Sequence, residues 1–164
     1  MNIARFSHVS PEQYAAKTLP GALPLAQIPL PRRATTGSAG YDFVCPMDVH
    51  LAPGEAVTIP TGIRCEMQPG WVLMLFPRSG LGFRHQLRLA NTMGVIDSDY
   101  FHADNEGHIL VRIVNGQLPP CNGGEMLTIA AGERFCQGVF LPYGLAEEDA
   151  VSTAREGGFG STGR

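Results

Sequence analysis

Alternation of apolar and polar residues with a period of two dominates the chain after Tyr41. Short runs of this kind cover residues 41–49, 56–59, 109–114 and 135–141, and Gly or Pro turn signals separate them. Short strands at such regular spacing are typical of β-sandwiches, jelly rolls and barrels. The pattern therefore predicts an all-β fold.

The strongest local pattern predicts a β-hairpin over residues 63–76. Apolar and polar residues alternate over 63–68, Pro69 and Gly70 supply a turn, and residues 71–76 form an unbroken apolar run. We expect the two strands to pair with each other. The first should be half exposed and the second buried on both faces.

The first 30 residues follow a different pattern. Ser10 as N-cap, Pro11 at the first helical position and Gln13 placed to close a capping box predict a short helix. Later prolines end this helix and keep the chain extended through Leu30. Residues 1–30 are therefore expected to form an N-terminal arm or cover with a short helix.

Composition and length agree with one globular domain. The chain has 164 residues, of which 44% are hydrophobic, and its 20 Gly and 13 Pro residues favour many turns and few long helices. A formal net charge of -3 without a long Lys/Arg run argues against a nucleic-acid surface, because duplex binding needs clustered cations.

Cysteine spacing and hydropathy indicate the cellular location of the protein. Its four cysteines have neither the close pairs of a zinc site nor the density of a disulfide scaffold, so reduced thiols are expected: Cys45, Cys65, Cys121 and Cys136. The chain shows neither a basic segment followed by an apolar run nor the roughly 20 apolar residues that span a bilayer. We expect a soluble cytoplasmic protein without a membrane partner.

The densest candidate chemistry lies in residues 94–100, where two carboxylates and a phenol follow the apolar pair Val95 and Ile96. If this segment is a strand that enters a tight hairpin, alternation would direct Asp97 and Asp99 to the same face, into a cleft. The apolar pair would then anchor the strand. Taken alone, the segment favours a solvated acidic turn over a functional cluster.

Two small-residue loops could also bind a ligand. Residues 35–42 deliver the carboxylate of Asp42 to the start of a strand, and residues 77–81 combine Arg78, the hydroxyl of Ser79 and a flexible backbone. The second combination suits a phosphate, through guanidinium, hydroxyl and amide donors. Ordinary turns are the alternative for both loops.

Two further segments lie nearer the C-terminus. Residues 132–137 place a cation and an amide at the entry to a strand, where an ordinary salt bridge is the alternative. Residues 155–164 combine glycines with Phe159, two Arg and two hydroxyls. Ordering costs about 1–2 kcal/mol per residue, so this tail would close only over a ligand that stacks on Phe159 and offers phosphates. A disordered tail is the alternative.

These stretches, in this order, resemble the five motifs of the trimeric dUTP pyrophosphatase (dUTPase) family. They are residues 35–42 (TTGSAGYD), 77–81 (PRSGL), 89–100 (LANTMGVIDSDY), 131–137 (AGERFCQ) and 155–163 (REGGFGSTG). The resemblance implies hydrolysis of dUTP to dUMP and pyrophosphate, which limits uracil incorporation into DNA and supplies dUMP for dTMP synthesis. It also implies a jelly-roll-like distorted β-barrel over residues 31–151. Three copies would form a homotrimer with shared active sites, over which residues 152–164 would close as a glycine-rich C-terminal arm.

The same resemblance implies roles for individual residues. Asp97 would deprotonate the water that attacks the α-phosphorus, and Tyr100 would pack beneath the deoxyribose and exclude a 2′-hydroxyl. Asp42 and Gln137 would steady water molecules on a Mg²⁺ cofactor. The residues implied to bind the base, sugar or phosphates are Arg78, Ser79, Gly80, Asn91, Gly94, Val95, Ile96, Tyr100, Arg134, Gln137, Arg155, Phe159, Gly160, Ser161 and Thr162.

The sequence departs from the family pattern at three places. The family usually reaches a glycine within two residues of Tyr100, whereas here residues 101–106 intervene. A second expansion covers residues 118–124, and Arg155 lies one position later than the family's arginine. Each insertion could be a lid, an altered trimer interface or a docking point for another protein. As an appended lid, residues 101–106 should be removable without loss of the trimer.

Two other functions share parts of this pattern. A dCTP deaminase or a bifunctional relative would use the same fold and nucleotide pocket, but Tyr100 and the glycine-rich tail favour a dUTPase, and a deaminase should carry a catalytic Glu instead. A regulatory protein would use its nucleotide-bound state as a switch and bind its partner through the insertions.

Overall fold

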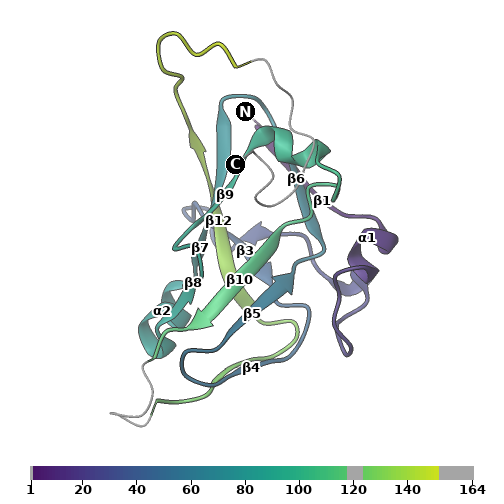
Figure 1. Cartoon of the computed structure of the whole chain (residues 1–164), viewed down its shortest axis with the longest axis vertical. Helices are drawn as coiled ribbons and strands as arrows, with labels where there is room; N and C mark the ends of the chain where they lie inside the picture. The colour runs from purple at the N-terminus through teal and green to yellow at the C-terminus, as the bar shows by residue number, and fades with distance from the viewer. Residues whose placement is uncertain (1, 118–123, 152–164) are drawn as a thin grey trace.

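The computed structural model describes residues 2–117 and 124–151, which form short antiparallel strands with a few short helices (Figure 1). The strands are β1 (Ala4–His8), β2 (Arg32–Arg33), β3 (Tyr41–Val44), β4 (Val49–Leu51), β5 (Ala56–Pro60), β6 (Ile63–Met67), β7 (Trp71–Pro77), β8 (Leu87–Leu89), β9 (Gly94–Ile96), β10 (Leu110–Asn115), β11 (Leu127–Ile129) and β12 (Arg134–Pro142). The helices are α1 (Pro11–Ala15), η1 (Leu25–Gln27), α2 (Ser79–His85) and η2 (Ser98–His102). The predicted all-β class is confirmed.

The strands form four antiparallel sheets. The largest has the order β2-β3-β12-β7-β9, a second has the order β5-β10-β8, and β1-β6 and β11-β4 form two pairs. Within the described part of the chain these sheets do not join into a closed barrel, because β2 and β9 remain the outer strands of the largest sheet. The expected jelly-roll-like distorted β-barrel is therefore not closed within the described part of the single chain.

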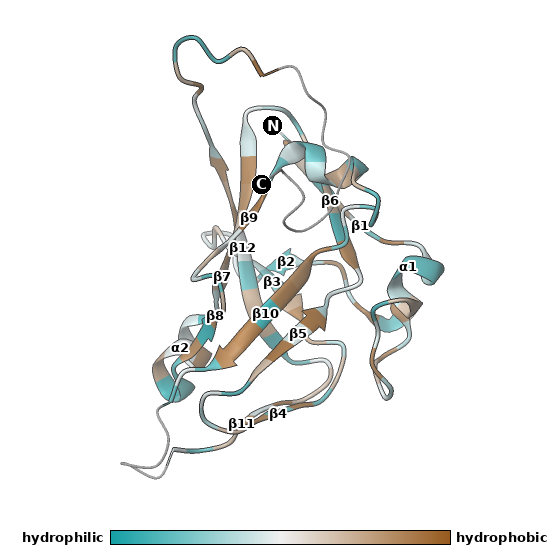
Figure 2. Cartoon of the chain, in the orientation of Figure 1, coloured by the Kyte–Doolittle hydropathy of each residue, from teal (hydrophilic) through white to brown (hydrophobic). Residues whose placement is uncertain are grey.

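One hydrophobic core unites the sheets. Figure 2 shows the apolar character of β10 and β5 along most of their length. The largest fully buried apolar side chains of this core come from all four sheets and from the residue before β10. They are Phe43, Ile59, Ile63, Leu73, Leu75, Leu89, Ile109, Ile113, Leu127, Ile129 and Phe135. Burying a side chain of this size contributes about 1.5–3 kcal/mol, so this core is the main source of stability.

Three of the four cysteines are described, and all three are free and buried. Burial raises the pKa of Cys45 to about 11 and that of Cys65 to about 12, and it also raises the pKa of Cys136. These thiols are therefore protonated and unreactive at neutral pH. The predicted reduced state is confirmed for them, while Cys121 lies outside the described residues.

The predicted hairpin over residues 63–76 was wrong in its pairing. Both strands exist and Gly70 makes the turn with φ +83°, but β6 pairs with β1, and β7 lies between β12 and β9. Both edges of β7 are thus occupied by strands that lie later in the chain. Only Leu73 and Leu75 are fully buried along β7, so the expected burial of both faces is absent in the single chain.

The N-terminal residues contribute more to the fold than an arm would. The predicted helix is confirmed as α1, and the Ser10 hydroxyl accepts the Gln13 amide at 3.1 Å. The reciprocal capping bond does not form, because the Ser10 amide donates to the Glu106 carboxylate at 2.8 Å. The sequence interpretation missed β1, and it missed that Val9 and Ile28 are buried in the main core.

Candidate active site

Three strand ends bring a carboxylate and two guanidinium groups together. One oxygen of Asp42 on β3 forms an ion pair with Arg78 Nε at 3.1 Å, and the other accepts a hydrogen bond from Arg134 Nη1 at 3.1 Å. Arg78 follows β7, and Arg134 begins β12. Because β3 and β7 both pair with β12, residues far apart in the sequence meet at one sheet end. We call these three residues the arginine cluster.

The arginine cluster carries a net positive charge and turns donors toward solvent. Two guanidinium groups share one carboxylate, and each guanidinium has five N–H donors in a planar fork. The Asp42 side chain is only 9% exposed, whereas those of Arg78 and Arg134 are 31% and 50% exposed. The carboxylate thus holds the two cations from beneath while their outer donors face solvent, an arrangement that suits a phosphate chain.

The residues predicted to steady a hydrated Mg²⁺ ion lie side by side. Asp42 and Gln137 are paired across β3 and β12, and Gln137 Nε2 donates to the Pro77 carbonyl at 3.2 Å. The other end of that carboxamide fills the space beside Gly40, where any Cβ would collide with it. Within residues 2–117 and 124–151 no group of three His, Cys, Asp or Glu side chains could hold a metal directly. One carboxylate and one amide fit Mg²⁺ held mainly by phosphate oxygens and waters.

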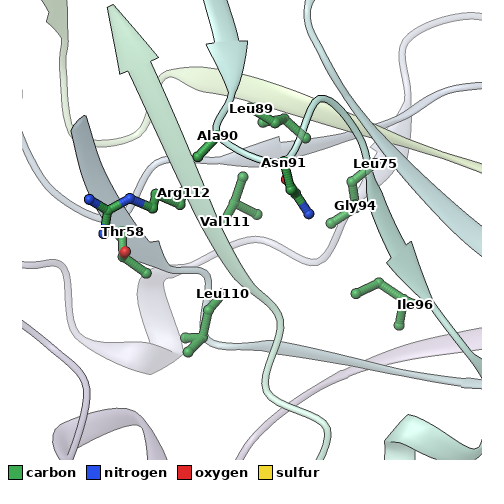
Figure 3. Close-up of a pocket in the computed structure, with 10 residues that line it drawn as sticks. All are labelled: Thr58, Leu75, Leu89, Ala90, Asn91, Gly94, Ile96, Leu110, Val111 and Arg112. Carbon is green, nitrogen blue, oxygen red and sulfur yellow. The ribbon is translucent and has the colours of Figure 1, made fainter. Parts of the chain in front are cut away.

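A cavity of about 500 Å³ opens between the β8–β9 turn and β10 (Figure 3). Its lining residues are Thr58, Leu75, Leu89, Ala90, Asn91, Gly94, Ile96, Leu110, Val111 and Arg112. Figure 3 shows Asn91 between Val111 and Gly94, so that a carboxamide lies in mainly apolar surroundings. A flat, partly polar ring fits such a pocket.

The cavity contains part of the predicted base-binding set. Asn91, Gly94 and Ile96 line it, but Val95 does not and is 55% exposed. The expectation that Val95 helps to anchor its strand was therefore wrong for the single chain, and Ile96 alone is buried. Sequence reasoning missed the contribution of β5 and β10, including Arg112, because no local motif marks those positions.

A tight turn fixes Asn91 in the cavity wall. The Thr92 amide donates to the Leu89 carbonyl at 3.0 Å, and Thr92 adopts a φ of 70°, which is rare for a β-branched residue. Gly94 packs so closely that an added Cβ would lie 3.1 Å from the Leu75 Cβ. Such a constrained turn holds the backbone at Asn91 in place without help from a ligand.

The segment around Asp97 does not have the structure considered from the sequence, a strand that enters a hairpin. Strand β9 ends at Ile96, and Asp97 occupies the N-cap position of η2. The Tyr100 amide donates to the Asp97 carbonyl at 3.2 Å, so Asp97 and Asp99 do not alternate as strand residues would. The Tyr100 side chain is buried, and neither it nor Asp97 lines the cavity.

The arginine cluster and Asp97 lie toward opposite ends of β7. In the pairing with β9, Gly94 lies opposite Leu75 and Ile96 opposite Leu73. Asp97, the next residue, therefore lies toward the start of β7. Arg78 follows the other end, after Pro77. Strand residues advance by about 3.3 Å, which makes the separation along β7 roughly 20 Å. One chain alone therefore does not bring Asp97 to the arginine cluster.

Ser79 and Gly80 were predicted to bind phosphates together with Arg78. They form the first turn of α2, whose N-cap residue is Arg78, and both are exposed. Amides in the first turn of a helix have no acceptor within that helix. Their position next to the arginine cluster agrees with the predicted role, which stays a prediction.

Residues 101–106 were expected to form a lid, an interface or a docking loop. Within the chain, the Arg64 guanidinium lies 3.6 Å from the Phe101 ring centre and donates to the Phe101 carbonyl at 2.7 Å. Ala103 is buried, and Glu106 binds Ser10 through both carboxylate oxygens. These contacts tie the segment to β6 and to Ser10 and do not fit an appended lid, while the interface and docking alternatives stay predictions.

Several predicted binding residues lie outside the described part of the chain. They are Arg155, Phe159, Gly160, Ser161 and Thr162, together with nearly all of the insertion at 118–124. Their roles stay predictions. Across the described residues, no helix has the length and apolar character that crossing a membrane requires.

Comparison with known proteins gives a consistent result. A family model described as dUTPase matches residues 26–163. The deoxyuridine 5′-triphosphate nucleotidohydrolase of Lactococcus lactis is 43% identical over 141 residues, which cover 84% of this chain and 90% of the relative. The crystal structure of a dUTPase from Streptococcus mutans has a TM-score of 0.65 at 34% identity, over 87% of this chain and 98% of that one.

A more distant structure supports the fold alone. A mutant dUTPase from phage phi11 of S. aureus, described with a structural Mg(II) ion, has a TM-score of 0.66 at 22% identity. The similarity covers 93% of this chain and 98% of the phage protein.

Proposed function

The chain belongs to the dUTPase family, and on this premise we propose that it hydrolyses dUTP to dUMP and pyrophosphate by attack of water on the α-phosphorus. The observation that carries the proposal is the arginine cluster, in which three separate sequence motifs converge on Asp42. This assembly suits a polyphosphate, and an apolar cavity with one carboxamide suits a pyrimidine base. The reaction would limit uracil incorporation into DNA and supply dUMP, in the cytoplasm.

Base selection would take place in the cavity. A carboxamide offers one acceptor and two donors, and the amides and carbonyls of the 91–96 turn add further groups. Uracil and cytosine present opposite donor and acceptor patterns at position 4 and at the neighbouring ring nitrogen. A site built around Asn91 for one pattern leaves buried groups unpaired with the other, which strongly disfavours the wrong base.

The phosphates would bind at the arginine cluster, with Ser79 and Gly80 beside it. Bound Mg²⁺ would neutralise phosphate charge there, with Asp42 and Gln137 holding its water molecules. Asp97 would take the proton from the attacking water, and carboxylates serve as general bases of this kind. Residues 152–164 would close over the nucleotide, with Phe159 stacked on the base and Arg155 on the phosphates.

The active site would be shared between subunits of a homotrimer. The separation of roughly 20 Å along β7 leaves Asp97 and the arginine cluster too far apart to act on one α-phosphate within a chain. Exposed apolar residues support such an assembly: Phe83 on α2 is 89% exposed and Val95 on β9 is 55% exposed. Apolar surface of this kind next to functional motifs is what subunit contacts bury.

Product identification tests the proposal. The protein is incubated with dUTP, dCTP, UTP or dTTP in the presence of Mg²⁺, and the products are separated and identified. We expect dUMP and pyrophosphate from dUTP at a rate far above that of any other nucleotide. Release of ammonia from dCTP would instead support the deaminase alternative, and no turnover of dUTP would reject the proposal.

A further inference from the structure

The hydroxyl of Tyr100 is held by the segment that follows it in the chain. It donates to the His108 carbonyl at 2.9 Å and accepts from Asn105 Nδ2 at 2.7 Å. A phenol has a single proton to donate, so the bond to His108 uses it. The ring is therefore fixed at its hydroxyl end by two bonds, and both partners lie beyond the family's usual motif.

The side chain of Asn105 is itself fully oriented. Its Nδ2 faces two oxygens, the Tyr100 hydroxyl and, at 3.4 Å, the His108 carbonyl, while its Oδ1 accepts the Gly107 amide at 3.2 Å. The amide nitrogen of Asn105 thus faces hydrogen-bond acceptors, and its oxygen faces a donor. An amide with this pattern cannot rotate without losing bonds at both ends.

The backbone around Asn105 has little freedom to move. Gly107 has a φ of 69°, and an added Cβ would lie 2.7 Å from the Phe101 Cα and from the Tyr100 carbonyl oxygen. Glu106 also has a positive φ, of 57°, which is uncommon for a residue with a side chain. Its carboxylate binds the Ser10 amide and hydroxyl at 2.8 and 2.6 Å, which holds this conformation.

The far side of the same turn is anchored in the core. The His108 side chain is fully buried, and its Nε2 accepts the Gly62 amide at 3.0 Å. The turn of residues 105–108 is thereby attached to the connection between β5 and β6. Tyr100 is therefore bonded to a rigid support instead of a mobile loop.

We propose that Asn105 is a positioning residue that fixes the Tyr100 ring and thereby sets the preference for a deoxyribose over a ribose nucleotide. The inference rests on the proposed function, in which Tyr100 leaves no room for a 2′-hydroxyl. Tyr100 is only 4% exposed, so a sugar could meet only a small part of it. A small shift of the ring would then open the space that a ribose needs.

The test measures kcat and KM for dUTP and UTP in Asn105→Ala and in a matched variant, Asp104→Ala. Asp104 is exposed and lies in the same insertion. Loss of the partly buried hydrogen bond between Asn105 and Tyr100 predicts a fall of about tenfold in the ratio of kcat/KM for dUTP to that for UTP in Asn105→Ala. The fall in this ratio should come mainly from a higher kcat/KM for UTP. Asp104→Ala should keep the wild-type ratio, and an equal fall in both variants would overturn the proposal.

Tyr100→Phe keeps the ring but removes both hydrogen bonds of the hydroxyl, to Asn105 and to His108, so it should lower the ratio at least as much. In the double variant, Asn105→Ala should add little to Tyr100→Phe, because both act through one hydroxyl. Two independent, multiplying effects would mean that Asn105 acts through general folding and would overturn the proposal. If Asn105→Ala does not fold, an unchanged ratio in Tyr100→Phe overturns it equally. Failure of the wild-type protein to hydrolyse dUTP would instead refute the proposed function.

Discussion

At the scale of single residues, the buried imidazole of His108 makes the fold sensitive to acid. Desolvation lowers its pKa from 6.5 to about 4, and the neighbouring Glu106 opposes this shift only in part. Between these pH values the unfolded chain binds a proton that the folded chain does not. Stability must therefore fall as the pH falls from about 6.5 to about 4, by up to about 3 kcal/mol.

The variant His108→Gln isolates this effect, because a carboxamide can still accept the Gly62 amide but does not titrate. We expect its free energy of unfolding, measured by urea titration between pH 4 and pH 7, to vary less with pH than that of the wild type. Glu106, whose pKa is lowered mainly by its bond to the Ser10 side chain, should keep its own contribution in both proteins. Parallel pH profiles would contradict the account.

The two carboxylates before Tyr100 should differ in their effect on turnover. Asp97→Asn removes the proposed base but keeps the shape, so kcat should fall by about 100-fold or more, while dUTP binding measured by calorimetry stays within a few-fold. Asp99→Asn serves as the matched control and should keep at least ten times the activity of Asp97→Asn. Near-normal turnover by Asp97→Asn would contradict the assignment.

Sequence reasoning singled out candidate residues but did not find the contacts between them. The motifs singled out Asp42, Arg78 and Arg134 because carboxylates and cations among small residues are unusual in plain turns. That one carboxylate bridges both guanidinium groups depends on three strands meeting, which no local pattern specifies. Asn105 was missed for the same reason, since its bond to Tyr100 exists only once the turn has closed.

At the scale of secondary-structure elements, alternation located strands but not their partners. The predicted strand at 41–49 is β3 followed by β4, and the runs at 56–59, 109–114 and 135–141 correspond to β5, β10 and β12. The hairpin prediction failed because both edges of β7 pair with other strands, β12 and β9, although β6 is its neighbour in sequence. Its partner β12 lies nearly 60 residues later in the sequence, beyond the reach of turn signals.

Residues 101–106 form a structural element, so their deletion should destabilise the protein. The deletion removes the buried Ala103 and the bonds of Asn105 and Glu106, and mutations of this kind cost several kcal/mol in total. We expect a clear fall in the midpoint of thermal unfolding measured by calorimetry. Asp104→Ala, within the same segment, should leave the midpoint almost unchanged. A deletion variant as stable as the wild type would show that the segment is an appended lid.

At the scale of the whole molecule, the position of β7 gives the proposed trimer a physical reason. Arg78 follows one end of β7, and β9 leads to Asp97 at the other, so the proposed phosphate-binding residues and the proposed base lie at different ends. Family resemblance alone implied shared sites. The strand register gives the proposed sharing a physical reason, because it places Asp97 and Arg78 roughly 20 Å apart along β7 within one chain.

Complementation between two inactive variants tests this account most directly. Asp97→Asn and Arg134→Ala are each purified alone and also co-expressed, and dUTP hydrolysis is measured in all three preparations. If each site takes Asp97 from one subunit and Arg134 from another, about one quarter of the sites in a random equal mixture contain both intact residues. The account predicts that co-expression restores roughly a quarter of wild-type activity. Co-expressed protein no more active than the separate variants would contradict it.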